Sequence, residues 1–208
     1  MSIILKLVLL MLTLGLASSW KLSPNTTPLK SLQKWALTSL VSFSFLSGSP
    51  VLADPIPLVG TPAPDFSLPS NTGKDIGLKD LAGKRTVLYF YPGDFTDGCT
   101  IEAKGFEKDI QKYNDLGVQI VGVSVDSVDK HLDFKKSYGL DFPLLSDKGG
   151  VVSGKYGSLI DLGFIGKFSN RQTYVISPES KVEYVFTDVQ DHLATHSSDV
   201  LAKLASLK

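Results

Sequence analysis

The chain has 208 residues, of which 43% are hydrophobic and 20% charged, a composition typical of globular proteins and not of disordered or fibrous ones. Residues 1–53 contain four lysines and no acidic residue, so residues 54–208 carry 17 basic against 21 acidic side chains. This mildly acidic part lacks the basic surface that nucleic-acid binding requires. We therefore expect one compact domain that does not bind nucleic acid.

The first 53 residues have the pattern of an export leader. The apolar run 3–16 is shorter than the ~20 residues of a membrane-spanning helix. A second apolar run, 35–46, follows two lysines and precedes the small residues that end at Ala53, which is the order of a secretory signal and its cleavage site. We predict cleavage after Ala53 and export to a periplasm or a thylakoid lumen. The alternatives are an uncleaved membrane anchor and a shorter leader that starts at Met11.

The remaining 155 residues predict alternating strands and helices. The first half contains an extended segment at 62–68, a buried strand at 86–91, a helix over 103–113, a second buried strand at 118–125 and a helix over 128–138 between Ser127 and Gly139. The second half contains a short strand near Leu144, a helical turn at 151–156, a hairpin of strands 173–176 and 182–186, and a terminal helix over 200–207. A strand, a helix and a strand in that order imply a parallel pair with a right-handed crossover. We expect an α/β domain with helices on both faces of a mixed sheet, and within that class a thioredoxin-like fold.

The single cysteine, Cys99, lies in a turn between the strand 86–91 and the following helix. Unpaired N–H groups at the start of a helix act as a partial positive charge, which favours a thiolate over a thiol. This position indicates a reactive group. The alternative is a small buried apolar side chain, as in many proteins with one cysteine.

The three histidines, His131, His192 and His196, have neither a neighbouring cysteine nor the close spacing of metal ligands. We interpret them as structural or surface residues. The sequence thus predicts no metal site and no cofactor.

Around the thiol, Pro92, Thr96 and Cys99 form a PxxxTxxC motif that continues as Cys-Thr-Ile-Glu-Ala. In this motif the chain resembles the peroxiredoxins, and more narrowly the peroxiredoxin Q or bacterioferritin comigratory protein group. The resemblance covers most of residues 57–208, including the Ala-Pro-Asp-Phe segment at 63–66, the Phe-Pro-Leu-Leu-Ser-Asp segment at 142–147, and Arg171. It implies a thiol peroxidase that reduces hydrogen peroxide and organic hydroperoxides.

The resemblance also implies a role for each residue of the motif. Cys99 is then the nucleophile that attacks the peroxide, and the Thr96 hydroxyl bonds to thiolate and peroxide. Pro92 shields the pocket from water, while Arg171 favours the thiolate and donates to the peroxide oxygens. Glu102 orients that arginine.

Each of these residues also has a simpler interpretation. Thr96 is suited to a turn and Pro92 to the end of a strand, and Arg171 is suited to a surface strand edge. A carboxylate such as Glu102 is favoured by the helix dipole in a first turn without any catalytic role. Arg171 is the stronger candidate of two arginines, because Arg85 precedes the strand at the end opposite the turn.

The chain departs from the group's pattern at two positions. Many members carry a second, resolving cysteine five residues after the first, where this chain has Lys104. The oxidised cysteine then needs an external thiol, such as thioredoxin or glutaredoxin with glutathione. A shielded thiol disfavours a disulfide between two chains, and the resemblance to the group implies a monomer. Asp97 replaces a proline before Gly98, and its charge disfavours the thiolate unless its side chain points into solvent.

Other functions fit the sequence less well. A disulfide oxidoreductase needs a CxxC motif, which is missing. The main alternative is a peroxide-sensing or chaperone-like module, in which Cys99 is oxidised once without turnover. An inert binding scaffold would not need Thr96, Cys99 and Arg171 together. Export raises the further question of which reductant is available, because compartments beyond the membrane are oxidising and poor in glutathione.

Overall fold

The central strand β3 (Arg85–Phe90) directs alternate side chains to opposite faces of a sheet. Val87 and Tyr89 belong to one buried cluster, and Leu88 and Phe90 belong to a second one. Both faces of the strand are therefore covered, which explains why its sequence is continuously apolar and does not alternate with polar residues.

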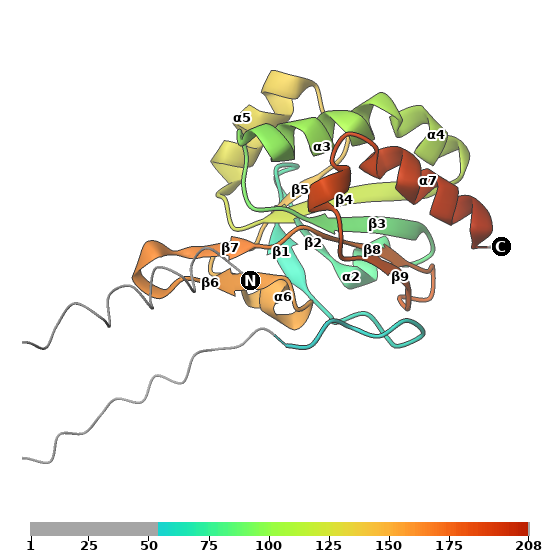
Figure 1. Ribbon diagram of the computed structural model, residues 1–208, viewed down its shortest axis with the longest axis horizontal. Coiled ribbons are helices and arrows are strands. Elements are labelled where there is room, and N and C mark those ends of the chain that lie inside the picture. Colours follow the sequence, from blue (N-terminus) through green and yellow to red (C-terminus); the bar gives the residue numbers. More distant parts are fainter. Residues whose placement is uncertain (1–53, 208) are drawn as a thin grey trace, which may run out of the picture. The chain divides into compact units, whose positions relative to one another are not determined.

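The computed structural model of the protein describes residues 54–207 (Figure 1). The predicted leader and its cleavage site after Ala53 lie outside the described residues. Within the described range, no helix is both long and apolar enough to cross a membrane.

The main sheet has the strand order β5-β4-β3-β8-β9. Strands β3, β4 and β5 are parallel, whereas β8 is antiparallel to both β3 and β9. The other strands of this sheet are β4 (Val118–Ser124), β5 (Leu144–Ser146), β8 (Gln172–Ile176) and β9 (Val182–Phe186). The predicted mixed sheet, its parallel pair and its hairpin are confirmed.

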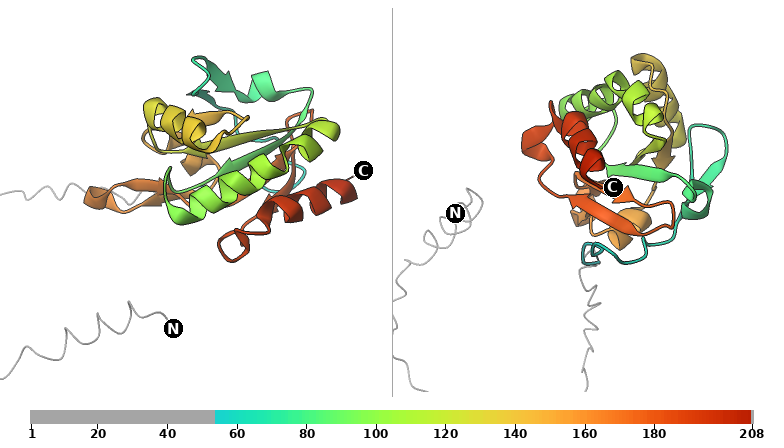
Figure 2. Two further views of the ribbon diagram at one scale, coloured as in Figure 1. Left: turned by 90° about the horizontal axis from the view of Figure 1, so that it is seen from above. Right: turned by 90° about the vertical axis from the view of Figure 1, so that its right-hand side faces the viewer.

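Helices cover both faces of the sheet, as Figures 1 and 2 show. One face packs against α3 (Asp97–Lys108), α4 (Ile110–Asp115), α5 (Val128–Tyr138) and α7 (His196–Ser206). The other face packs against α2 (Leu78–Leu81), α6 (Val151–Lys155) and the small antiparallel sheet of β1 (Ser67–Pro69) and β2 (Asp75–Gly77). Helix α5 is capped as predicted, because the Ser127 hydroxyl accepts from the Lys130 N–H and Gly139 adopts a left-handed conformation.

Two helix boundaries differ from the prediction. The helix expected over 103–113 is interrupted at Asp109, whose backbone angles (φ −100°, ψ 5°) end α3 before α4 begins. The Asp109 carboxylate accepts from Lys112 Nζ and Ser197 Oγ, both at 2.8 Å. The bond from Ser197 joins Asp109 to α7, and the periodicity of the sequence gives no sign of such a tertiary contact. The terminal helix begins at His196, four residues before the apolar residue Val200 at which it was predicted to start.

A narrow hairpin arm was not predicted. It consists of β6 (Leu159–Asp161), the 3-10 turn η1 (Gly163–Ile165) and β7 (Lys167–Ser169), and it extends away from the main sheet (Figure 1). Strands of three residues are too short to give a recognisable alternation of polar and apolar residues. A second 3-10 turn, η2 (Gln190–His192), precedes α7 and was likewise not predicted.

Candidate active site

The chain passes from the end of β3 through a short turn into α3, and this connection places Cys99 in the first turn of the helix. The Thr100 N–H donates to the Thr96 carbonyl at 2.9 Å, which closes that first turn. The Cys99 side chain is only 1% exposed and packs in the cluster between the sheet and α3. The predicted position of the thiol at a helix start is confirmed, and it is buried as well.

The turn before the cysteine contains a strained residue. Phe95 has a positive φ of 65°, which is uncommon for a residue with a side chain, and its ring packs edge-on against Phe134 of α5 at 5.2 Å. The next residue, Thr96, is the N-cap of α3, but its hydroxyl donates back to the Gly93 carbonyl at 3.2 Å. The Thr96 hydroxyl proton is therefore used within the turn, while its lone pairs are free to accept.

Arg171 contacts the thiol directly. Its side chain is 6% exposed and reaches from the start of β8 to α3. Nη2 donates to Cys99 Sγ at 3.1 Å, Nη1 to Glu102 Oε2 at 2.7 Å, and Nε to Gln190 Oε1 at 2.9 Å. Three acceptors, two from α3 and one from η2, thus fix the planar guanidinium beside the sulfur. Arg85 lies at the other end of β3, as predicted from the sequence. It pairs there with Glu183.

Glu102 lies three residues after Cys99 on α3, so both side chains share one face of the helix. Burial raises the pKa of the Glu102 carboxyl to about 7, although the charge and hydrogen bond of Arg171 act in the opposite direction. Its second oxygen, Oε1, is buried and has no hydrogen-bond partner among the described residues. Glu102 is therefore more than a first-turn carboxylate favoured by the helix dipole.

A second buried polar cluster fixes the turn that precedes Cys99. Asp94 Oδ1 accepts from the Tyr91 hydroxyl at 2.7 Å, and Oδ2 lies 2.7 Å from His131 Nδ1. His131 Nε2 lies 3.1 Å from the Leu145 carbonyl, and all three polar side chains are buried. The two ring nitrogens of His131 thus link the Asp94 carboxylate in the turn to the Leu145 carbonyl of β5. Sequence reasoning placed His131 correctly as structural but missed Asp94, which is separated from its partner by 37 residues.

The other residues singled out in the sequence lie nearby. Pro92 is half-buried between β3 and the turn, and Asp97 is an exposed side chain at the first position of α3. Lys104, at the position of a resolving cysteine, is exposed, with its Nζ 5.8 Å from the Tyr138 ring centroid. Within residues 54–207, no three side chains of the metal-binding types are grouped to hold an ion.

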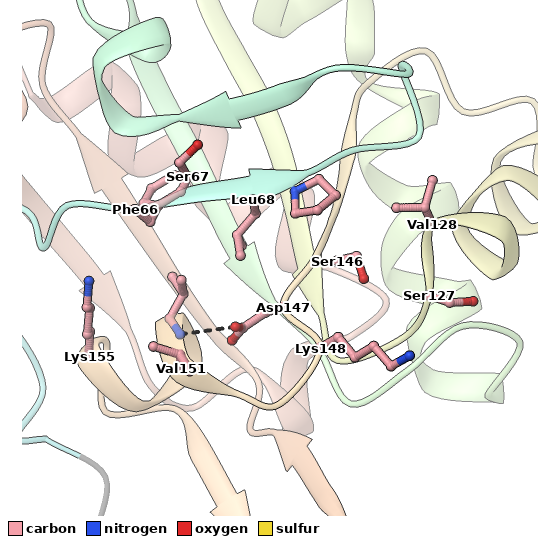
Figure 3. A pocket seen from close by; sticks show the side chains of 12 residues that line it. Phe66, Ser67, Leu68, Ser127, Val128, Ser146, Asp147, Lys148, Val151 and Lys155 are labelled. Carbon is pink, nitrogen blue, oxygen red and sulfur yellow. Dashed lines mark hydrogen bonds between the residues drawn. The ribbon is translucent and has the colours of Figure 1, made fainter.

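A separate cavity of about 510 Å³ lies between β1, the start of α5 and α6 (Figure 3). Its lining includes Phe66, Ser127 and Asp147 but none of the residues around the thiol. The Asp147 carboxylate accepts from the Val152 N–H at 3.1 Å and from the Ser153 N–H and hydroxyl at 2.7 Å, so it caps α6. The hydrogen bonds of the Asp147 carboxylate therefore hold α6 in place. We place the candidate active site at Cys99 and not in this cavity.

A buried thiol at a helix start, bound by an arginine and placed after a central strand of a mixed sheet, defines a thioredoxin-fold protein with a cysteine in a polar site. The comparison with known families is more specific. Residues 59–185 match the model of the AhpC/TSA family. The chain belongs to this family.

Individual relatives place the chain within the family. It is 40% identical over 149 residues to the "Putative peroxiredoxin bcp" of Coxiella burnetii, which covers 70% of this chain and 97% of that protein. It is 37% identical over 148 residues to the chloroplastic peroxiredoxin Q of Oryza sativa subsp. japonica, covering 71% of this chain and 67% of that protein.

Solved structures agree with these relatives. The fold matches peroxidoxin BcpB from Mycobacterium tuberculosis with a TM-score of 0.66 and 33% identity, covering 73% of this chain and 99% of that one. It also matches the bacterioferritin comigratory protein of Xanthomonas campestris with a TM-score of 0.65 and 31% identity, covering 74% and 98% respectively.

These findings confirm the thioredoxin-like fold and the resemblance to the peroxiredoxin Q group. The protein is a thiol-dependent peroxidase with a single cysteine. Its substrate class is a peroxide and its reductant is a thiol. The alternative of a sensing or chaperone-like module is not favoured.

Proposed function

We propose that the protein reduces hydrogen peroxide and organic hydroperoxides through a sulfenic acid on Cys99. The Cys99 thiolate attacks one peroxide oxygen, an S–O bond forms as the O–O bond breaks, and the departing oxygen takes a proton to leave as water or an alcohol. The observation that carries this proposal is the 3.1 Å hydrogen bond from Arg171 Nη2 to Cys99 Sγ. A structure of the related Xanthomonas protein is described in terms of alkyl peroxide reduction, which supports the inclusion of organic substrates.

Each of the side chains around Cys99 then has a separate role in binding or reducing the peroxide. The Arg171 guanidinium favours the thiolate and stabilises the negative charge that grows on the departing oxygen. The Thr96 hydroxyl donates its own proton to Gly93, so it is free to accept a hydrogen bond from the peroxide O–H. Glu102 holds Arg171 in place through a 2.7 Å bond, and half-buried Pro92 limits the access of water to the thiol.

Recycling requires thiols from another molecule, because the chain has no second cysteine. One external thiol condenses with the sulfenic acid to give a mixed disulfide and water, and a second thiol releases reduced Cys99 and a disulfide. We propose thioredoxin, or glutaredoxin with glutathione, as the reductant. The 1% exposure of Cys99 disfavours a disulfide between two copies. We propose a monomer on the resemblance to the peroxiredoxin Q group.

We propose further that the first 53 residues direct export to a periplasm or a thylakoid lumen, with cleavage after Ala53. The support is the order of lysines, apolar run and small residues in the sequence. An uncleaved leader would instead anchor the domain at the membrane, and a reductant on the same side would then supply the thiol. The amino-terminal sequence of the protein recovered from its cells distinguishes the two.

The test of the peroxidase proposal is hydrogen peroxide consumption by the full chain with excess dithiothreitol, beside Cys99→Ser and with the mass of the cysteine peptide recorded. We expect many turnovers for each wild-type molecule and none for Cys99→Ser. One oxidation followed by a stall would support the sensing alternative. A rate no faster than that of dithiothreitol alone would contradict the assignment of Cys99.

A further inference from the structure

We propose that His196 is a positioning residue of the peroxide site: its imidazole Nε2 lies beside the free oxygen of Glu102, favours the carboxylate form of Glu102 and keeps it directed at Arg171. This inference rests on the proposed function of Cys99 and Arg171. It adds the first residue of α7, which lies 94 positions from Glu102 in the sequence.

The geometry behind this inference is a chain of side chains that ends at the sulfur. His196 Nε2 is 3.8 Å from Glu102 Oε1, which has no hydrogen-bond partner among the described residues. The other carboxylate oxygen accepts from Arg171 Nη1 at 2.7 Å, and Nη2 donates to Cys99 Sγ at 3.1 Å. In the tautomer with its proton on Nε2, the ring directs the positive end of an N–H dipole toward a buried carboxylate oxygen that has no hydrogen bond, which favours the charged form of that carboxylate.

The His196 ring is held firmly enough to serve as a fixed dipole. Its side chain is 2% exposed, and the rings of Phe106 and Phe186 pack edge-on against it at 5.5 and 5.4 Å. Nε2 also lies 2.8 Å from the hydroxyl of Thr173, which is two residues after Arg171 and in β8. With the ring proton on Nε2, this hydroxyl accepts the hydrogen bond, and Glu102 Oε1 interacts with the N–H dipole over the longer distance of 3.8 Å. The same strand therefore positions the arginine and the ring that faces its carboxylate partner.

The imidazole acts as a neutral group. Burial lowers the pKa of His196 to about 4, against a weaker raising effect of Asp199, while His192 and Arg171 lower it further. The titratable and charged groups around the ring are Glu102 from α3, Arg171 beside β8, His192 from η2, and Asp199 from α7 itself. A neutral ring adds no formal charge beside the Arg171–Glu102 pair, whose guanidinium donates to the thiol.

His196→Phe tests this inference, because phenylalanine preserves the aromatic packing but removes both ring nitrogens. We expect the second-order rate constant with hydrogen peroxide to fall at least fivefold at pH 7, and the pH at which the rate rises to move upward, since Glu102 then retains its proton to higher pH. His196→Gln, whose amide nitrogen can replace Nε2, should stay within about twofold of wild type. His192→Phe, an exposed histidine four residues earlier, is the matched control and should match wild type.

A double-mutant cycle separates positioning from a general effect on packing. In a Glu102→Gln background, His196→Phe should change the rate less than twofold, because there is no carboxylate left to hold. An equal loss in both backgrounds, or a wild-type rate and pH profile for folded His196→Phe, would overturn the inference. If His196→Phe does not fold, Thr173→Val takes its place, since it removes the hydroxyl that fixes the ring. Absence of Cys99-dependent turnover in the wild type would instead overturn the proposed function itself.

Discussion

Gly98 and Arg171 are in such close contact that no other residue fits at position 98 without displacing the guanidinium. A β-carbon on Gly98 would lie 2.7 Å from Arg171 Nη2, the atom that donates to Cys99. It would also lie 3.1 Å from Leu193 Cδ1 on the other side. The glycine before the cysteine is therefore required for close approach of the arginine, since its backbone has no positive φ.

Gly98→Ala should lower the rate constant with hydrogen peroxide more than tenfold, because the guanidinium must move away from the sulfur. The control is Gly105→Ala in the same helix, where the nearest atom to a new β-carbon is Ser197 Cβ at 3.8 Å. That variant should keep its rate and gain about 0.5–1 kcal/mol in free energy of unfolding from the higher helix propensity of alanine. Equal rates for the two variants would contradict the close-contact argument.

Arg171→Ala should slow the attack on hydrogen peroxide more than tenfold, since it removes the hydrogen bond to Sγ and the charge that favours the thiolate. Arg171→Lys should also be slow, because one ammonium group cannot reproduce the three-way contact of the guanidinium. Stopped-flow rate constants at pH 7 provide the measurement. Arg85→Ala is the control: its partly exposed pair with Glu183 contributes about 0–1 kcal/mol to stability, and its rate should match wild type.

Glu102 and His196 should give opposite pH dependences of folding stability. The pKa of Glu102 is raised by burial from 4.5 to about 7, so its effect lowers the free energy of unfolding as the pH rises through that window. The pKa of His196 is lowered by burial from 6.5 to about 4, so its effect lowers the free energy of unfolding as the pH falls through that window.

Urea denaturation at pH 5 and pH 8 tests the first of these effects. The free energy of unfolding of Glu102→Gln, relative to that of wild type, should rise by roughly 2 kcal/mol from pH 5 to pH 8, because the amide does not have to lose a proton. For the matched variant His196→Gln, the free energy of unfolding relative to wild type should rise as the pH falls. Stability curves for the three proteins that run parallel would show that neither group titrates in these ranges.

His131→Ala should lower the free energy of unfolding by about 3–5 kcal/mol, since it leaves the buried Asp94 carboxylate without its imidazole partner. The peroxide rate should fall as well, because Asp94 belongs to the turn that precedes Cys99. His192→Ala removes an exposed histidine and should change stability by about 0.5 kcal/mol or less. A loss below 1 kcal/mol for His131→Ala would mean that the cluster does not hold the turn.

Several long-range contacts of the fold could not be predicted from local pattern. Periodicity and the PxxxTxxC motif located the strand, the helix and Cys99, because these signals lie within a few residues of one another. The bond between Tyr113 and Ser197 joins residues 84 positions apart, and the break at Asp109 depends on the same packing of α7. No short segment of the sequence carries that information.

The sequence by itself determined the α/β order, the position of Cys99 at a helix start, the need for an external thiol and the candidates Thr96, Arg171 and Glu102, because propensity, periodicity and motif are properties of neighbouring residues. Only the tertiary structure decided which groups touch the sulfur and which lie behind it. Arg171 reaches Cys99 across 72 positions, and His196 approaches Glu102 from the last helix. Such contacts arise when the sheet and helices pack around one core, so they depend on the whole chain.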